Sequence, residues 1–173
     1  MTLDTMTIEQ LNTLPGSDAT DWFMQSCAAQ NWCEQMVNGR PYADISRLME
    51  RAEQYWLNAA KQDYLEAFSA HPMIGDLSSL QAKYTNTQTM AGAEQSGTAG
   101  ADPKVLAELA ELNQRYYQQN GFIFIVCATG LSAEAMLEKL QRRIHNSTET
   151  EMRIAAAEQL KITQLRLAKN LSN

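Results

Sequence analysis

The chain has 173 residues, of which 45% are hydrophobic, so it is long enough to bury a sizeable core without disulfide or metal cross-links. Its formal net charge is -6 and its sequence pI is about 4.9. Nucleic-acid binding depends on clustered Lys and Arg, and the sequence has no basic stripe, so a nucleic-acid partner is not expected. The expected organisation is one compact domain, residues 1–173.

The sequence predicts a cytosolic protein without a membrane partner. Residues 1–7 include Asp4 and no basic residue, unlike the start of a secretory signal. The longest apolar run, Phe122–Ala128, is far shorter than the roughly 18 residues that a membrane-spanning helix needs. The cysteines are odd in number and lack CxxC spacing, so we expect free thiols at Cys27, Cys33 and Cys127.

Two stretches carry strong helical patterns. From Asp44 to Phe68 apolar residues recur three and four apart, which predicts one continuous amphipathic helix. The positions on this face are Ile45, Met49, Ala52, Trp56, Ala60, Tyr64 and Phe68. A second helix is expected to begin with a cap at Asp102 and with Pro103 in its first turn, and to stop at Asn120-Gly121.

Two further helices follow in the last third of the chain. Ser132 is expected to cap a helix that ends near His145. Thr148 and Glu151 have the spacing of a capping box, which predicts the start of a long C-terminal helix.

Phe122–Cys127 differs from these stretches, because it is rich in β-branched and aromatic residues and follows a glycine, as strands do. A single strand cannot form a sheet. We therefore interpret it as a buried extended segment whose backbone groups are available to something else, such as a ligand. Residues 7–38 are also expected to be helical, with a break near Pro15-Gly16. The predicted fold is all-α, a single compact bundle of about eight helices.

Residues 84–102 are rich in Thr, Gly, Ala and Ser, which is typical of a flexible linker between domains. The flanking segments are too short for two good cores, and Glu94-Gln95 interrupts the small residues, so an ordered loop beside a site is the alternative. Composition leaves both interpretations open.

Two histidines occur in the chain, and they have different surroundings. His71 follows the strongest helical pattern, and Pro72 disfavours helical geometry at the residue before it. His71 is therefore expected at a helix end, as a general acid or base or as a structural hydrogen-bonding residue. His145 lies in a polar stretch and is expected on the surface. Without HxxxH spacing, the histidines do not predict a zinc site.

Two other charged residues are candidates for a site. Glu94 lies among small residues, which would allow a substrate to approach closely, although a solvated loop charge is the alternative. Arg166 lies between two leucines late in the last helix, where its stem can pack while its guanidinium binds a carboxylate. A solvent-facing arginine is the alternative there.

Several motifs together resemble those of a known family, the 2-oxo-4-hydroxy-4-carboxy-5-ureidoimidazoline (OHCU) decarboxylases. The resemblance rests on His71-Pro72-Met73-Ile74-Gly75, Glu94-Gln95 and Gly121-Phe122-Ile123-Phe124-Ile125-Val126-Cys127-Ala128-Thr129-Gly130. It continues through Arg143-Ile144-His145-Asn146 to the last helix, with Glu158, Lys161-Ile162 and Leu165-Arg166-Leu167. It therefore spans nearly the whole chain.

The resemblance implies an all-helical single domain, usually a homodimer, that converts a small-molecule substrate, OHCU, to (S)-allantoin in urate breakdown without a cofactor. It also implies site residues. His71 matches the essential histidine and Glu94 the active-site glutamate, so both are expected to be catalytic. The expected substrate-binding residues are Pro72, Gln95, Phe124, Ile125, Val126 and Arg166, with Arg153 on the same helix as the alternative to Arg166.

The chain departs from the family pattern at one position. Many relatives have a serine three residues before the glutamate, where this chain has Ala91, so Ser96 or a backbone group would have to replace its hydrogen bond. Two other interpretations stay open: a non-enzymatic helical adaptor, and a thiol enzyme built on Cys33 or Cys127. The second lacks a marked thiolate-activating environment in the sequence.

Overall fold

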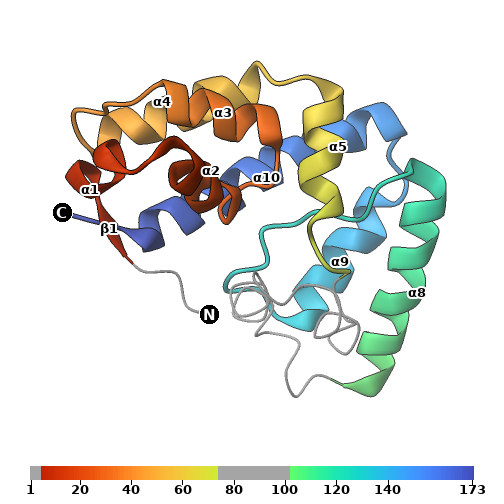
Figure 1. Ribbon diagram of the computed structural model, residues 1–173. Helices are drawn as coiled ribbons and strands as arrows, with labels where there is room; N and C mark the ends of the chain where they lie inside the picture. Colours follow the sequence, from red (N-terminus) through yellow and green to blue (C-terminus); the bar gives the residue numbers. More distant parts are fainter. Residues whose placement is uncertain (1–4, 74–101) are drawn as a thin grey trace. The chain divides into compact units, whose positions relative to one another are not determined.

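The computed structural model describes residues 5–73 and 102–173. They fall into two compact units, one made of Met1–Ala67 with Gln159–Asn173 and the other of Phe68–Glu158. Regular structure is almost entirely helical, as the sequence predicts, and Figure 1 shows the helices in chain order. The described residues form one small sheet, in which β1 (Met6–Thr7) pairs in parallel with β2 (Leu171–Ser172). This pair was not predicted from the sequence.

The first unit begins with short helices that pack on one another. A capping box between Thr7 and Gln10 starts the first of them. Pro15 separates the first two, as predicted, but a second break, at residues 25–29, was not expected. The helices are α1 (Ile8–Thr13), α2 (Gly16–Met24), α3 (Gln30–Asn38) and α4 (Ile45–Leu57), with α2 packed on α3 and α3 on α4.

The prediction of one continuous helix from Asp44 to Phe68 is wrong. The chain forms α4 (Ile45–Leu57) and α5 (Lys61–Ser69), with a break between them. Asn58 ends α4 by donating its side-chain amide to the Gln54 carbonyl over 2.8 Å. Asp63 then accepts from the Ala60 amide over 2.9 Å, which satisfies a backbone donor at the start of α5. Local side-chain hydrogen bonds therefore interrupt a helix that apolar spacing alone would continue.

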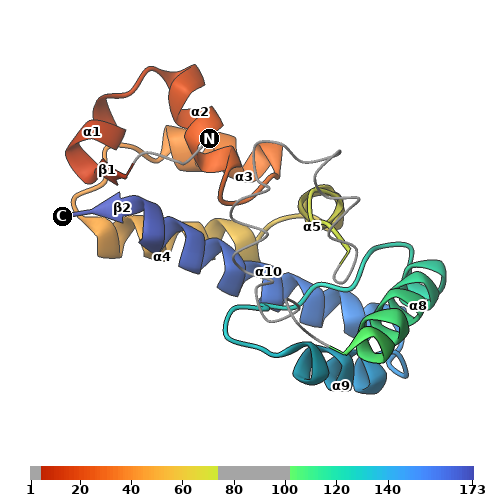
Figure 2. The same cartoon turned by 90° about the horizontal axis from the view of Figure 1, so that it is seen from below.

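The β1–β2 pair joins the two ends of the chain that make up the first unit. Figure 2 shows β2 beside β1, where the last helix, α10 (Thr148–Asn170), ends. The core of this unit contains the aromatic residues Phe23 and Trp32, whose rings meet edge to face at 5.9 Å. Both are almost fully buried.

The second unit contains α8 (Pro103–Asn120), α9 (Ala133–Arg143) and the first part of α10, and α8 packs on α9. The predicted ends of α8 are confirmed. Asp102 accepts from the Lys104 amide over 2.8 Å, and Gly121 takes a positive φ of 79° at the other end. Ser132 caps α9 as predicted, by accepting from the Ala135 amide over 3.1 Å.

The predicted capping box of Thr148 and Glu151 is wrong. Ser147 is the capping residue, because its hydroxyl accepts from the Thr150 amide over 3.2 Å. Thr148 is the first residue of α10, and its hydroxyl instead donates to Asn120 Oδ1 over 2.9 Å. Glu151 turns away from the helix end into the interior of the unit, where it is fully buried.

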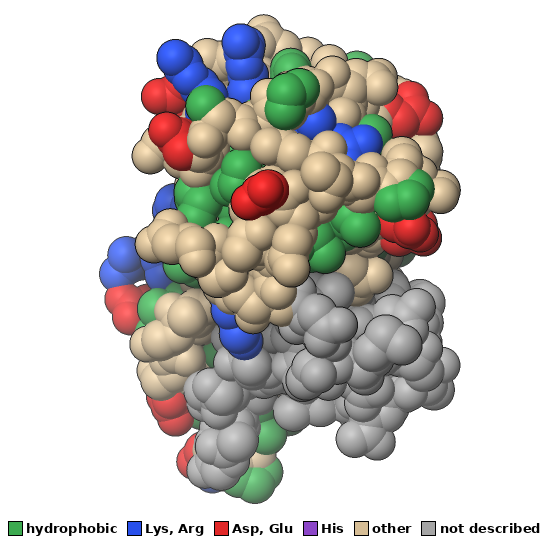
Figure 3. All heavy atoms as spheres, turned by 60° about the vertical axis from the view of Figure 1, so that its left-hand side comes forward, with side chains coloured by type: hydrophobic (Ala, Val, Ile, Leu, Met, Phe, Trp, Pro, Cys, Tyr) green, Lys and Arg blue, Asp and Glu red, His purple; other side chains and the backbone are tan. Residues whose placement is uncertain are grey.

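The surface carries charges of both signs. Figure 3 shows one face, on which basic and acidic side chains both occur and apolar side chains lie in small groups between them. Among the described residues, no helix combines the length and the apolar character needed to cross a membrane.

Candidate active site

His71 lies just beyond the C-terminal end of α5, as Pro72 predicts. Its amide donates to the Phe68 carbonyl over 3.1 Å, which closes a last turn after the helix. His71 is half-buried, and Pro72 behind it is buried. His71 is therefore anchored through its backbone to the end of α5.

Phe122–Cys127 forms neither helix nor strand and crosses the second unit as a largely buried segment, as predicted. The rings of Phe68 and Phe122 lie 5.4 Å apart, so the segment starts beside the end of α5 that carries His71. Met73 lies beside α8, with its sulfur 4.0 Å from the Gln114 side-chain nitrogen. The structure thus brings the His71-Pro72 motif and the 122–127 segment, two of the predicted parts of the site, into one region.

Aromatic and cationic side chains surround Phe124. The rings of Tyr116 and Phe124 meet edge to face at 5.5 Å. The guanidinium carbon of Arg143 lies 4.4 Å from the centre of the Phe124 ring, which is cation–π geometry. Phe124 is 2% exposed, so these contacts leave its ring little freedom.

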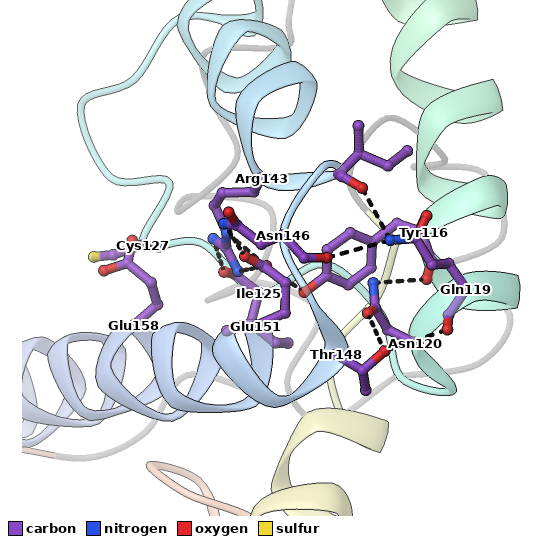
Figure 4. A network of polar contacts seen from close by, with 11 residues as sticks. Tyr116, Gln119, Asn120, Ile125, Cys127, Arg143, Asn146, Thr148, Glu151 and Glu158 are labelled. Carbon is purple, nitrogen blue, oxygen red and sulfur yellow. Dashed lines mark hydrogen bonds and ion pairs between the residues drawn. The ribbon is translucent and has the colours of Figure 1, made fainter.

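Arg143 also binds the backbone of the segment. Its Nη1 donates to the Ile125 carbonyl over 2.6 Å, and its Nε donates to Glu151 Oε1 over 2.9 Å. Its Nη2 lies 2.9 Å from the same carboxylate oxygen, at ion-pair distance but without the alignment of a hydrogen bond. Figure 4 shows the dashed contacts that Arg143 makes with Ile125 and Glu151. One buried cation therefore joins a helix carboxylate to a backbone carbonyl.

Glu151 is the centre of this cluster. Besides Arg143, its carboxylate accepts from the Tyr116 hydroxyl over 2.6 Å and from the Asn146 side-chain amide over 2.8 Å. Burial raises the pKa of Tyr116 well above its ordinary value, and the hydrogen bond to Glu151 raises it further. Tyr116 therefore acts as a neutral donor to the carboxylate.

Glu158 holds the far end of the segment. Its Oε1 accepts from the Cys127 amide over 3.2 Å, and Figure 4 shows it reaching from α10 toward Cys127. The expectation that the segment's backbone groups are open to a ligand is therefore wrong for the Ile125 carbonyl and the Cys127 amide, which protein side chains occupy. The amide and carbonyl of Val126 form no hydrogen bond with another described residue.

The sequence did not predict the cluster of Tyr116, Arg143, Asn146 and Glu151, because Glu151 was expected in a capping box and Arg143 was given no role. A signal was present. Arg143 lies three residues after Leu140 and seven after Met136, on the buried face of α9. His145, by contrast, is exposed, as predicted.

The two arginines of α10 differ in burial. Arg166 is 8% exposed and lies in the first unit, whereas Arg153 is exposed and lies in the second. Beside Arg166 is Cys27, whose pKa burial raises to about 12, although a hydrogen bond from Thr163 and the charge of Arg166 act in the opposite direction. All three cysteines are free thiols, with Cys27 and Cys33 buried and Cys127 half-buried.

Several predicted site residues lie outside the described residues, namely Glu94, Gln95, Ala91 and Ser96. Of the stretch 84–102, for which a linker and an ordered loop were both open, only Asp102 is described, so both interpretations stay open. Within the part of the chain that the structure describes, no group of three or more His, Cys, Asp or Glu residues is placed to hold a metal ion.

Comparison with known proteins adds independent findings. A family model for OHCU decarboxylase matches residues 12–168. A bifunctional uric acid degradation protein of Arabidopsis thaliana is 36% identical over 148 residues, which are 85% of this chain but 45% of that protein. A 2-oxo-4-hydroxy-4-carboxy-5-ureidoimidazoline decarboxylase of Haloferax volcanii is 25% identical over 97% of this chain and 98% of its own length.

A solved structure is also similar to this fold. It is a crystal structure of OHCU decarboxylase in the presence of (S)-allantoin, with 37% sequence identity and a TM-score of 0.74. The likeness covers 87% of this chain and 96% of that chain.

Proposed function

This chain belongs to the OHCU decarboxylase family, and we propose on that basis that it converts OHCU to (S)-allantoin with release of carbon dioxide, as a step of urate breakdown. The observation that carries the proposal is the match of the family model across nearly the whole chain. The chain spans less than half of the bifunctional Arabidopsis protein, so the proposal concerns this one reaction and not the activities of longer relatives.

The reaction needs a place for the electron pair of the breaking carbon–carbon bond. Many decarboxylases supply it with a cofactor. In OHCU, a ring imine lies beside the carbon that bears the hydroxyl and the carboxylate, so the pair can move into the ring as carbon dioxide leaves. The resulting enol anion takes up one proton overall, because the former imine carbon and nitrogen each gain a hydrogen while the hydroxyl loses its proton and becomes a carbonyl. We therefore assign the protein acid-base and positioning roles and no cofactor.

His71 is the proposed acid-base residue. Its half-buried place on backbone fixed by the Phe68 carbonyl suits a side chain that must be both held and accessible. We assign it to hydrogen-bond or deprotonate the substrate hydroxyl and to orient the departing carboxylate. General acid-base help of this kind accelerates a reaction by roughly 10²- to 10⁴-fold.

The other residues are assigned to binding and orientation. Glu94 would hydrogen-bond the ureido or ring nitrogens, with Gln95 beside it. Arg166 would grip an anionic group of the substrate with its planar fork. Pro72 and the backbone of Phe124, Ile125 and Val126 would line the pocket. Their contribution is mainly to hold the substrate in a reactive geometry.

A matched pair of histidine variants tests the assignment of His71. In His71→Asn the amide keeps hydrogen-bonding capacity but cannot transfer a proton, so carbon dioxide release from freshly generated OHCU should fall by roughly 10²-fold or more. His145→Asn changes an exposed histidine and should match wild type. Equal rates for wild type and a folded His71→Asn variant would remove His71 from the mechanism.

Two more pairs test the binding roles. Glu94→Gln should retain more activity than Glu94→Ala, because the amide still accepts a hydrogen bond. Arg166→Lys should raise KM, because lysine cannot reproduce the two-donor fork, whereas the exposed Arg153→Lys should not. A higher KM for Arg153→Lys alone would move the substrate-binding role to Arg153.

We also propose a homodimer of single-domain subunits in the cytosol. Light scattering on the purified chain tests the dimer. The three tryptophans, Trp22, Trp32 and Trp56, all lie in the first unit, so tryptophan fluorescence follows that unit while far-UV circular dichroism follows both. A single domain predicts that the two unfolding curves coincide. Separate transitions would indicate two domains.

A further inference from the structure

We propose that Arg143 and Glu158 are positioning residues that fix the backbone on both sides of Val126, and that Glu151 holds Arg143 in place for this purpose. The inference rests on the proposed function, in which the Phe124–Val126 backbone contacts the substrate. It adds residues that act on that backbone from behind and do not themselves touch the substrate.

The geometry of the peptide bond gives the first step. The Ile125 carbonyl and the Val126 amide belong to one planar peptide unit, and in a trans unit they point in opposite directions. The only cis bond among the described residues precedes Pro41, so this unit is trans. Because Arg143 Nη1 holds the Ile125 carbonyl over 2.6 Å, the Val126 amide is directed away from Arg143.

The next peptide unit is held in the same way from its other end. The Cys127 amide donates to Glu158 Oε1 over 3.2 Å, so the Val126 carbonyl is directed away from Glu158. The donor and acceptor of Val126 form no hydrogen bond with another described residue. A cation that binds a carbonyl and an anion that binds an amide thus fix both peptide planes around Val126. A ring amide or ureido group, which has an acceptor beside a donor, is the chemistry that such a backbone would match.

The positions of Glu151 and Glu158 on α10 support a joint role in holding the 122–127 segment. Glu151 and Glu158 are seven residues apart, which places them on one face of α10, two turns from each other. One binds Arg143 and the other binds the segment directly. A buried ion pair is weak evidence for stability, since apolar residues of similar size often stabilise as well. Here the arginine also binds a backbone carbonyl, which apolar residues could not do.

The main test removes the buried pair while limiting the damage to folding. In Arg143→Met/Glu151→Gln both charges disappear together, and the glutamine oxygen can still accept from the Tyr116 hydroxyl. The matched control, Arg142→Met/Glu138→Gln, makes the same change in an exposed ion pair of the same helix. Thermal unfolding and far-UV circular dichroism identify the folded variants.

We expect the buried double variant to remain folded and to lose roughly 10- to 100-fold in kcat/KM on freshly generated OHCU, because a small displacement of a binding group has effects of this size. The control should be unchanged. Wild-type kcat and KM in the folded double variant would overturn the role of Arg143.

Glu158 provides a second test that does not depend on the ion pair. Glu158→Gln keeps an oxygen that can accept from the Cys127 amide, whereas Glu158→Ala does not. We expect Glu158→Gln to rescue most of the kcat/KM that Glu158→Ala loses, with Glu149→Ala, an exposed first-turn residue of α10, as the unchanged control. Equal losses in Glu158→Gln and Glu158→Ala would overturn a role through this hydrogen bond.

Hydrogen exchange separates a failure of this inference from a failure of the proposed function, because it needs no substrate. In the free protein, the Cys127 amide should exchange faster in Glu158→Ala than in wild type, while amides in the middle of α8 keep their protection. An unchanged Cys127 amide would show that Glu158 does not hold the segment, whatever the wild-type protein does with OHCU.

Discussion

The two faces of α9 carry ion pairs that differ in almost every physical respect. Arg142 pairs with Glu138 four residues earlier, and the two side chains are 75% and 62% exposed. Arg143, the next residue, pairs with Glu151 across the second unit, and these side chains are 11% and 0% exposed. Of these adjacent arginines, Arg142 therefore has a solvated charge, whereas Arg143 has a buried charge that contacts Glu151 and the Ile125 carbonyl.

This difference shows that burial and partners, not residue type, decide what a charge does. An exposed pair is screened by water and holds two flexible side chains for little gain. Removing one partner of a buried pair is strongly destabilising, because the other charge is left without solvent or counterion. The buried pair can therefore position the backbone at Ile125, and the exposed pair cannot.

The largest expected effect comes from breaking each pair at its carboxylate. Glu151→Ala should destabilise the fold by about 3–5 kcal/mol, because it strands a buried guanidinium. Glu138→Ala should change the free energy of unfolding by at most about 1 kcal/mol. Urea unfolding of both variants measures this difference in the free energy of unfolding. Similar decreases in the two variants would contradict a larger contribution from the buried pair.

A smaller effect is expected from the hydroxyl that donates to Glu151. Tyr116→Phe removes only this oxygen and leaves a buried carboxylate short of one donor, at a cost of about 1–3 kcal/mol. Tyr117→Phe is the matched control on the exposed side of α8. Should both variants unfold at the same urea concentration as wild type, the Tyr116–Glu151 hydrogen bond would have no energetic weight.

The raised pKa of Tyr116 predicts that the stability of wild type and that of Tyr116→Phe depend differently on pH. In the unfolded chain a tyrosine ionises near pH 10, whereas Tyr116 in the folded chain stays neutral to higher pH. The unfolded state therefore loses its proton first, and wild-type stability should fall as pH rises above about 10. Tyr116→Phe lacks this contribution, so its decline should be shallower. Parallel curves between pH 8 and 11 would contradict the shift.

The smallest effect is expected in a test that changes no residue and compares the reactivity of buried and half-buried cysteines. Burial raises the pKa of Cys27 to about 12 and also raises that of Cys33, so neither thiol is ionised at neutral pH. Cys127 is only half-buried. Mass spectrometry after brief alkylation of the native protein should find Cys127 labelled first. Preferential labelling of Cys27 or Cys33 would contradict their buried placement.

Sequence patterns predicted the fold where one local signal decides the structure. Asp102 and Gly121 mark the ends of α8 because a cap and a left-handed residue act within one turn. Phe122–Cys127 was predicted as an extended segment from composition alone. The break at Asn58 was missed because two polar side chains there compete with a regular apolar pattern.

The candidate site was predictable only in part. His71 and the 122–127 segment lie in one region, and their motifs pointed to both. Arg143 and Glu151 were not predicted, since each looks like a surface charge or a capping residue until its partner across the unit is known. Only the position of Arg143 on the apolar face of α9 hinted at its burial. Polar contacts between residues far apart in the chain are difficult to predict from a single sequence.

The handedness of the product tests the central claim most directly. OHCU generated in place from urate by urate oxidase and hydroxyisourate hydrolase decays slowly to racemic allantoin without a further enzyme. With the purified wild-type chain added, circular dichroism should show rapid formation of (S)-allantoin. A racemic product appearing at the spontaneous rate would contradict the account and would favour a non-enzymatic helical adaptor.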